Sequence, residues 1–469
     1  MALAVAVYSL SSRAAQNLTS ITTECLPSCA NQYRSLAGIV LSCLITVFLC
    51  IWVALHLNVP EPVDTRDMRY LVRFKIWIGS SFRCIVVPIC VTLVFPEWVL
   101  GIAVLQFSKA TRLAQKIREL QNGEAKVTRQ HGFFILMGGF HLFRQIHPPS
   151  LNNSREEAGE GAHLLAKKSA AEAGDSRHDQ TSSGKTSLVE EFGEPLHPLD
   201  EFDVFRLLKD RKLRLPTSAE LQDKCKSDGL AKFLVVVQTL WFIAQCIARK
   251  VSKLPLTELE VITLGYTLLT VSMYIAWWDK PYRVTFPVRV YETLPERTNE
   301  QKGLKRRMEE GNFVVIALAH ATGSQGELVD LRSVKRVPMF YSGYNETQWN
   351  VSNFASILTT IIVGTLFGAV HFLAWSSPFP STHMQFLWRF AAIIMTAVPP
   401  AAAVGFILVG LMAMVSEKLG ALILLPLLLL PPLYFVGRGI TIVLALVTLA
   451  TLPLDAYRDV EWSDIFPHI

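Results

Sequence analysis

Two charged side chains lie inside long apolar runs, where a charge is costly. Glu97 lies within the apolar run 84–107, and Arg438 lies inside the last apolar run of the chain. A charge at the centre of a bilayer costs roughly 2.5–3.5 kcal/mol on insertion scales. Because opposite charges lower that cost by pairing, one interpretation is a Glu97–Arg438 ion pair. The other places Glu97 at an interface and extends the Arg438 side chain to the membrane surface.

His371, near the end of the apolar run 354–375, is the third candidate. It is either an interfacial histidine with satisfied hydrogen bonds or a base or ligand in a polar site. The catalytic residues are therefore unknown, and Glu97, His371 and Arg438 are the candidates. If the three face one enclosed pocket, an enzyme or a transporter is favoured. If they face separate surfaces, a sensor or a scaffold is favoured.

The sequence contains no complete catalytic or nucleotide-binding motif. Residues 184–186 imitate the end of a phosphate-binding loop, but Asp179 stands where that motif requires glycine. The three histidines within 131–147 have no metal-ligand spacing. We therefore predict no cofactor and no metal, and the sequence leaves open whether the protein is an enzyme.

Other polar residues near the apolar runs have structural explanations. Glu258 and Glu260 follow Thr257 at the start of the run 256–278, where helix capping and the helix dipole account for them. Asp279 and Lys280 follow two tryptophans, and we expect them to anchor the end of that helix at the membrane interface.

Long apolar helices must position these residues. Of the 469 residues, 51% are hydrophobic and 18% are charged, whereas soluble domains carry about 25% charged residues. The apolar residues form runs of about 20, the length of a membrane-crossing helix. This pattern excludes an ordinary soluble enzyme, a disordered chain and a disulfide-stapled secreted module. We predict an all-α membrane fold of about seven transmembrane helices, with six and eight as the alternatives. The predicted spans are 36–57, 84–107, 230–248, 256–278, 354–375, 386–415 (broken by Pro399 and Pro400) and 433–452, the last after a broken start from 419.

The remaining residues divide the chain into further segments. We predict a polar N-terminal segment at 1–35 with a candidate signal peptide, helices 1 and 2 in 36–107, a long loop at 108–229, helices 3 and 4 in 230–278, a folded loop at 279–353, helices 5 to 7 in 354–452, and a C-terminal tail at 453–469. The long loop opens with an amphipathic helix, 110–121, expected on the membrane surface. It also holds an insert, 154–197, whose composition predicts disorder. The folded loop is predicted to form a small α+β patch with strands at 313–318 and 337–341.

Cysteines, sequons and basic residues bear on orientation. Cys25 and Cys29 could form a disulfide if the N-terminus faces an oxidising compartment. The net charge is +6, but the basic residues lie mostly between apolar runs, which indicates topology signals and headgroup contacts rather than nucleic acid. Basic residues flank helix 2 on both sides, and we slightly favour an N-terminus outside. Candidate glycosylation sites, all on the side of the N-terminus if there are seven crossings, are Asn17, Asn152, Asn345 and Asn350.

Several stretches spread along the chain together carry a resemblance to a known group of proteins. They are 56–60 (HLNVP), 96–100 (PEWVL), 131–134 (HGFF), 137–140 (MGGF), 277–281 (WWDKP), 337–343 (VPMFYSG), 371–375 (HFLAW), 378–380 (PFP) and 462–469. The chain resembles a large family of uncharacterised multi-pass membrane proteins of filamentous fungi, common in mushroom-forming species. The resemblance implies a membrane location and a fungal source, and no activity. One departure is Phe372, where cysteine more often follows the histidine.

These observations lead to two classes of function. The first is an integral multi-pass membrane protein of sensor or scaffold type. The alternative is a membrane-embedded enzyme acting on a lipid or isoprenoid, or a transporter. The expected partner is the lipid bilayer and not nucleic acid, and protein partners are unknown. We expect the protein in the secretory pathway or the plasma membrane.

Overall fold

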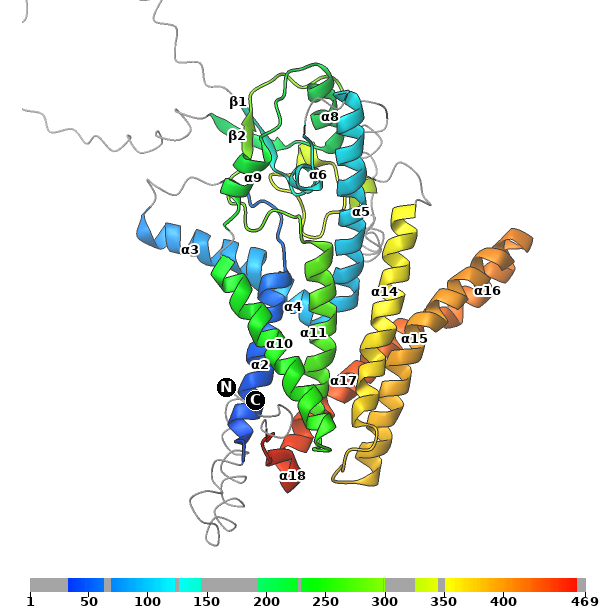
Figure 1. The fold of residues 1–469 in the computed structure, drawn as a ribbon. Coiled ribbons are helices and arrows are strands. Elements are labelled where there is room, and N and C mark those ends of the chain that lie inside the picture. Colours follow the sequence, from blue (N-terminus) through cyan, green and yellow to red (C-terminus); the bar gives the residue numbers. More distant parts are fainter. Residues whose placement is uncertain are drawn as a thin grey trace, which may run out of the picture.

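The computed structural model describes residues 33–62, 69–122, 126–144, 193–226, 229–297, 299, 325–344 and 351–461. Most of these residues are helical, and the long helices form a bundle (Figure 1). Short helices, three strands and loops lie together at one end of the bundle (Figure 1). We call this part the cap and define it as residues 110–144, 193–226, 279–297 and 325–344, as far as they are described.

Among the described residues, six helices are long and apolar enough to cross a membrane, and a bent helix pair would make a seventh. Helices are present in all seven regions where the sequence predicts a span. The six long ones are α2 (Leu36–Ala54), α10 (Gly229–Val251), α11 (Glu258–Ala276), α14 (Val351–Val370), α15 (Thr382–Val415) and α17 (Leu430–Thr448), the last preceded by α16 (Glu417–Leu427). Short helical segments complete this part of the chain: η5 (His371–Ala374), η6 (Leu449–Thr451) and α18 (Leu454–Tyr457).

The second predicted span is not one straight helix. A π-helical turn, η2 (Phe82–Val86), leads into α4 (Val87–Val94), and α5 (Pro96–Leu120) then departs at 109°. Pro96 is the first residue of α5, a position where proline is favoured, whereas a proline inside a helix breaks it. Glu97 therefore lies in the first turn of α5 rather than in the middle of a span. The preceding α3 (Tyr70–Ser81) is a further helix that the sequence analysis missed.

The predicted surface helix 110–121 is wrong as a separate element. These residues are the second half of α5, which continues into the cap without a break. Ala110, Ala114 and Ile117 are buried there, and α6 (Arg129–Leu136) packs against them. The apolar stripe of an amphipathic helix therefore faces protein here and not lipid.

Two proline pairs behave differently. The sequence predicts that Pro399 and Pro400 break a span, but α15 continues through both prolines. Each proline removes one backbone donor and bends the helix, yet the remaining hydrogen bonds keep it continuous. By contrast, the predicted broken start of the last span is present as a short interruption, because two residues separate α16 from α17, and Pro431 and Pro432 follow in the first turn of α17. Residues 422–451 nevertheless form one candidate span.

The cap contains a three-stranded sheet in the order β2-β1-β3. The strands are β1 (Phe140–Arg144), β2 (Glu194–Pro198), antiparallel to β1, and β3 (Val288–Val290), parallel to β1. Residues 337–341, predicted as a strand, form a turn and loop with Phe340 at φ 62°, and 313–318 lies outside the described residues. The end of the predicted disordered insert is also wrong, because residues 194–197 belong to β2. Helical segments of the cap are α8 (Glu201–Lys209), α9 (Ser218–Lys224), η3 (Gln325–Glu327) and η4 (Leu331–Ser333).

Hydrogen bonds show which chain segments lie at each end of the bundle. The residue before α2 meets the residues after α17, since Arg34 N donates to Tyr457 O at 2.7 Å. We call this the terminal end. The residues after α2 meet the cap, since Asn58 Nδ2 donates to Pro338 O at 2.8 Å. Because α5 also ends in the cap, the bent pair α4–α5 starts and finishes at the cap end (Figure 1).

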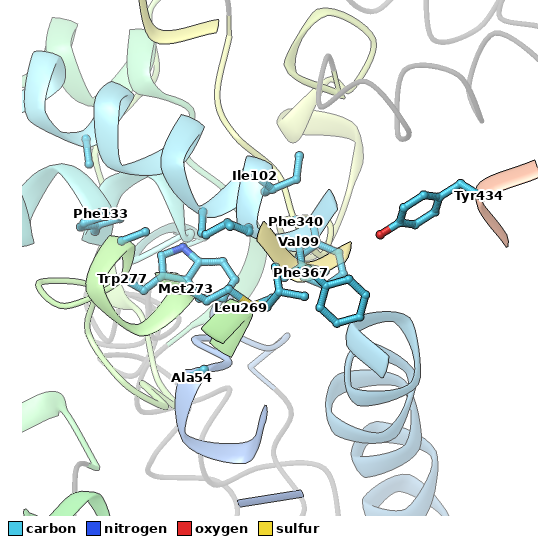
Figure 2. Packing of buried hydrophobic residues seen from close by; sticks show 14 of the residues in the cluster. Ala54, Val99, Ile102, Phe133, Leu269, Met273, Trp277, Phe340, Phe367 and Tyr434 are labelled. Atoms are coloured by element: carbon cyan, nitrogen blue, oxygen red, sulfur yellow. The ribbon is translucent and has the colours of Figure 1, made fainter. Parts of the chain in front are cut away.

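The largest cluster of buried apolar side chains lies between α5, α11, α14 and α15 and reaches the cap. Figure 2 shows Met273 and Leu269 of α11, with Trp277 directly after that helix, gathered beside Val99 of α5 and Phe367 of α14. By contrast, many side chains on the outer helices are uncovered, such as Phe233 (62% exposed) on α10 and Phe406 (61%) on α15. The bundle thus has an apolar centre and an apolar outer surface.

Candidate functional site

The bend at Phe95 creates the position of Glu97. In a continuous helix the backbone N–H of residue 97 would bond the carbonyl of Leu93, but the chain turns by 109° between them. Glu97 lies instead in the first turn of α5, where the helix dipole favours a carboxylate. The bend therefore frees the carbonyl of Leu93 and places an acidic side chain beside it.

The predicted ion pair between Glu97 and Arg438 is present. Arg438 Nη1 lies 2.8 Å from Glu97 Oε1 and 3.0 Å from Glu97 Oε2. The hydroxyl of Tyr434, one turn earlier on α17, donates to Glu97 Oε1 at 2.7 Å. The side chain of Arg438 is 5% exposed and that of Glu97 is 13% exposed. The two charges thus form one enclosed neutral unit, and the alternative of two separate interfacial charges is wrong.

The second guanidinium nitrogen of Arg438 bonds the helix break. Its Nη2 donates to the hydroxyl of Tyr266 on α11 at 2.8 Å and approaches Leu93 O at 3.4 Å. The Tyr266 hydroxyl in turn donates to Leu93 O at 2.5 Å. The carbonyl released by the bend is thus satisfied by side chains from two other helices, as a buried backbone carbonyl requires. We call Glu97, Arg438, Tyr266 and Tyr434 the central network.

His371 lies near the central network without bonding it. The ring of Phe367 separates the two, with its centroid 5.1 Å from the His371 ring and 4.9 Å from Arg438 Cζ. His371 Nδ1 lies 2.9 Å from Phe367 O, while its fully enclosed Nε2 has no hydrogen-bond partner among the described residues. The three candidates from the sequence therefore converge on one region, but only Glu97 and Arg438 are in direct contact.

The central network leaves few free sites for chemistry. Both carboxylate oxygens of Glu97 accept hydrogen bonds, and both terminal nitrogens of Arg438 donate. The arrangement stabilises buried charges and joins α5, α11 and α17. Within the part of the chain that the structure describes, no group of three metal-binding side chains occurs.

The sequence analysis missed Tyr266 and Tyr434. For Tyr434 a signal existed, because it precedes Arg438 by four residues and so shares its helix face. Tyr266 had no such signal, since its partner lies 172 positions away. The candidate sites Cys25, Cys29, Asn17, Asn152, Asn345 and Asn350 all lie outside the described residues.

A second polar cluster joins the bundle to the cap. Lys280 Nζ donates to Asn58 Oδ1 and to Gln106 Oε1, each at 3.1 Å. Gln106, on α5, also accepts from Trp277 Nε1 at 2.8 Å and donates to Tyr341 O at 2.6 Å. Burial lowers the pKa of Lys280 from 10.5 to about 7. Lys280 was expected at a membrane interface as an anchor, but it is enclosed by protein.

The other polar residues at the two ends of α11 have the capping and anchoring roles that the sequence suggested. The Thr257–Glu260 capping box is present at the start of α11, and Glu260 also pairs with Arg34 at the terminal end. Asp279 pairs with Arg129 of α6 at 3.0 Å. These residues fix the ends of helices, Glu260 in a buried pair and Asp279 in a pair that is partly exposed.

Together these features define a helical protein with apolar helices of membrane-spanning length, a folded cap and a buried ion pair at a helix break. The chain belongs to a family of unknown function (DUF8562), whose model matches residues 4–155 and 206–300. The matched ranges contain Glu97 and Tyr266 and end before His371 and Arg438. No curated protein matches the chain, and no solved structure matches it either.

Proposed function

We propose that this protein is an integral multi-pass membrane protein of sensor type, in which α5 couples the central network to the cap. The observation that carries this proposal is the continuity of α5. The helix begins beside Glu97 and ends at Leu120 in the cap, a length of about 37 Å at 1.5 Å per residue. A rigid helix with its ends in two different environments transmits a displacement at one end to the other.

The apolar outer surface of the bundle supports the membrane location. Soluble monomers rarely expose large contiguous apolar patches, yet Leu240 on α10 is 60% exposed and Phe354 on α14 is 65% exposed. Lipid tails would cover these side chains, so the lipid bilayer is the proposed partner. The resemblance to multi-pass proteins of filamentous fungi is in keeping with this location.

The arrangement of the ends supports six crossings and a re-entrant pair. Because the segments flanking α2 and α17 meet at the terminal end, an even number of crossings separates the two. The bent pair α4–α5 then enters from the cap side, turns at Phe95 and returns. Such broken helices are tolerated at membrane depth where they are buried in protein. Glu97 marks the tip of this hairpin.

Basic residues support a cytoplasmic cap. Arg69, Arg73 and Lys75 lie in the short connection between α2 and α4 at the cap end. At the terminal end, the arginines Arg34 and Arg249 are engaged by Glu260 and by backbone carbonyls, and the short connection between α10 and α11 adds one exposed lysine, Lys253. Because positive residues in short connections remain on the cytoplasmic side, the cap faces the cytoplasm and both termini face the opposite side. The protein would reside in the secretory pathway or the plasma membrane.

A transporter or a membrane-embedded enzyme is the second candidate. The convergence of Glu97, Arg438 and His371 around Phe367 favours it, because a buried ion pair beside an unbonded histidine nitrogen is a common feature of proton and substrate pathways. A lipid or an isoprenoid would be the substrate class for an enzyme of this kind.

One pair of variants separates the two candidates. Glu97→Gln removes the charge at the network end of α5, and Glu119→Gln removes the same charge at the exposed cap end as a control. If α5 couples the two regions, Glu97→Gln alone changes the rate at which trypsin cleaves the cap at the exposed residues 209–214. If Glu97→Gln folds, leaves that rate unchanged and abolishes the cellular phenotype of the protein, the transporter or enzyme is favoured. An unchanged rate with an intact phenotype overturns the coupling.

A further inference from the structure

The helix α3 contributes no residue to the central network, and its position and surface need a separate explanation. It lies between the end of α2 and the start of η2. In Figure 1 it runs across the direction of α2 and α11, at the level where the bundle meets the cap. A helix of this orientation at the end of membrane-spanning helices lies where the lipid headgroups begin.

One stripe of α3 is apolar, on a helix whose residues 69–75 are all exposed, Val72 on the opposite side included. Tyr70 and Leu71 are 78% and 71% exposed, and Phe74 and Ile78 are each 46% exposed. At 100° per residue these four side chains occupy one stripe of the helix. The rings of Tyr70 and Phe74 stack at 6.3 Å, which makes the stripe continuous along the first turn.

Cations border this apolar stripe on both sides. Lys75 follows Leu71 by four residues and lies on one side, and Arg73 lies on the other, adjacent to Tyr70. Both are exposed, as is Arg69 just before the helix. The helix itself, residues 70–81, contains no aspartate or glutamate, and the nearest acidic residues before it in the sequence are Asp67 and Asp64. Apolar side chains between cations match the boundary between acyl tails and anionic headgroups.

We propose that α3 is an in-plane anchor that binds anionic phospholipids of the leaflet next to the cap. The apolar stripe enters the acyl region, and Arg69, Arg73 and Lys75 bind the headgroup phosphates and carboxylates. Because α3 leads directly into η2 and α4, lipid binding fixes the start of the chain segment that carries the bend before Glu97. The proposal requires the membrane location argued above, and it adds a lipid class and a binding surface.

Hydrogen–deuterium exchange of the full-length protein in lipid nanodiscs tests this binding. Two compositions are compared, phosphatidylcholine alone and phosphatidylcholine with about 30% phosphatidylserine, an anionic lipid of cytoplasmic leaflets. We expect the backbone amides of α3 to exchange at least about fivefold more slowly with phosphatidylserine, since each basic residue near an anionic surface contributes roughly that factor. Raising the salt concentration should reduce the protection.

A triple variant, Arg69→Gln, Arg73→Gln and Lys75→Gln, should lose the dependence on phosphatidylserine. The matched control removes the same charge from the cap, at the exposed residues Lys209, Lys212 and Arg214, and should keep it. Equal exchange of α3 in both lipids, or protection that survives in the triple variant, overturns the proposal. If the protein does not enter nanodiscs at all, the membrane location itself is wrong, and the two failures are therefore distinguishable.

Discussion

Two unfavourable features meet at the centre of the bundle, a free backbone carbonyl and the buried charge of Glu97. Pro96 ends the preceding helix, which leaves the carbonyl of Leu93 without its helical partner, and the carboxylate introduces a buried charge. Arg438 compensates for both, since its guanidinium pairs with the Glu97 carboxylate and its Nη2 lies 3.4 Å from Leu93 O. The energetic result is asymmetric, because a buried pair is close to neutral in stability while half a pair is costly.

The ion pair leads to a double-variant prediction. Glu97→Gln and Arg438→Gln should each destabilise the protein by about 3–5 kcal/mol, because each leaves one buried charge without its partner. The double variant should be more stable than the sum of the two losses predicts, since it leaves no unpaired charge. Thermal unfolding in detergent measures the three variants, and strict additivity would show that the pair has no energetic coupling.

Lys280 leads to a pH prediction. The unfolded chain keeps the lysine proton up to the ordinary pKa of 10.5, whereas the folded chain releases it near 7. Unfolding therefore takes up a proton between these values, so the free energy of unfolding should rise with pH from about 7 to 10, by at most about 1.4 kcal/mol per pH unit. Below pH 7 both states hold the proton, and this contribution is constant.

Lys280→Met should flatten that rise, and Lys212→Met, at an exposed position of the cap, should leave it unchanged. The measurement is the stability of wild type and variants at several pH values in this window. An identical pH dependence of wild type and Lys280→Met would contradict a depressed pKa at Lys280.

At the scale of elements, α5 is the helix that connects the bundle to the cap. Its first half packs against α11 and α14 in the bundle, and its second half packs against α6 in the cap. The contact with α6 is close, because a Cβ atom at Gly132 would lie 2.1 Å from the backbone oxygen of Ala110. No side chain other than hydrogen fits there without separating the two helices.

Gly132→Ala should therefore destabilise the cap by about 1–3 kcal/mol, the usual cost of overpacking. The control is Gly410→Ala on α15, where a Cβ atom would meet nothing within 4 Å and where alanine should stabilise the helix by up to about 1 kcal/mol. Thermal unfolding of the two variants checks the difference. Equal stability of both would mean that α5 and α6 can separate at no cost.

At the scale of the whole molecule, the sheet of the cap decides how much of the insert can be removed. Arg144, the last residue of β1, is the register partner of Glu194, the first residue of β2. A short loop can therefore connect the two strands. Deletion of 154–190 should preserve expression and membrane insertion, as the composition of that segment predicts. Deletion of 154–198 removes β2 and should cause aggregation, and equal behaviour of the two deletions would contradict this role of β2.

The number of crossings can be tested with tags. Six crossings put an N-terminal and a C-terminal tag on the same side, and a tag inserted in 154–190 on the other side. Protease protection in sealed vesicles measures this, and seven crossings would separate the two terminal tags. With the cap in the cytoplasm, Asn17 should accept a glycan, while Asn152, Asn345 and Asn350 should not. The six-crossing proposal thus replaces the expectation that all four sequons share one side.

Much of the helical architecture could be predicted from the sequence, because it depends on local composition. The start of the first span at Leu36 was correct, although α2 ends at Ala54 and not at 57. The interruption shortly before Pro431 and Pro432 and the capping box of Thr257 and Glu260 were also correct. Errors arose where packing overrides local pattern. The amphipathic stretch 110–121 covers protein instead of lipid, and the pair Pro399 and Pro400 leaves α15 unbroken.

The candidate site was partly predictable as well, because two of its residues are charges within apolar runs. The cost of a charge among apolar residues drew attention to Glu97 and Arg438 and indicated that they could pair. Tyr266 could not be found in this way, because a tyrosine in an apolar helix carries no such cost. Only the packing of α11 beside α17 brings its hydroxyl to 2.8 Å from Arg438 Nη2.

By itself, the sequence determined the positions of the long apolar helices, since these depend on how many apolar residues follow one another. Only the tertiary structure decided that α4 and α5 turn back at Phe95, that the segment before α2 meets the segment after α17, and that Glu97 binds a residue 341 positions away. The direction of a chain after a break, and the partner of a buried charge, are set by which helices become neighbours. That choice depends on the packing of the whole chain and is not contained in any single segment.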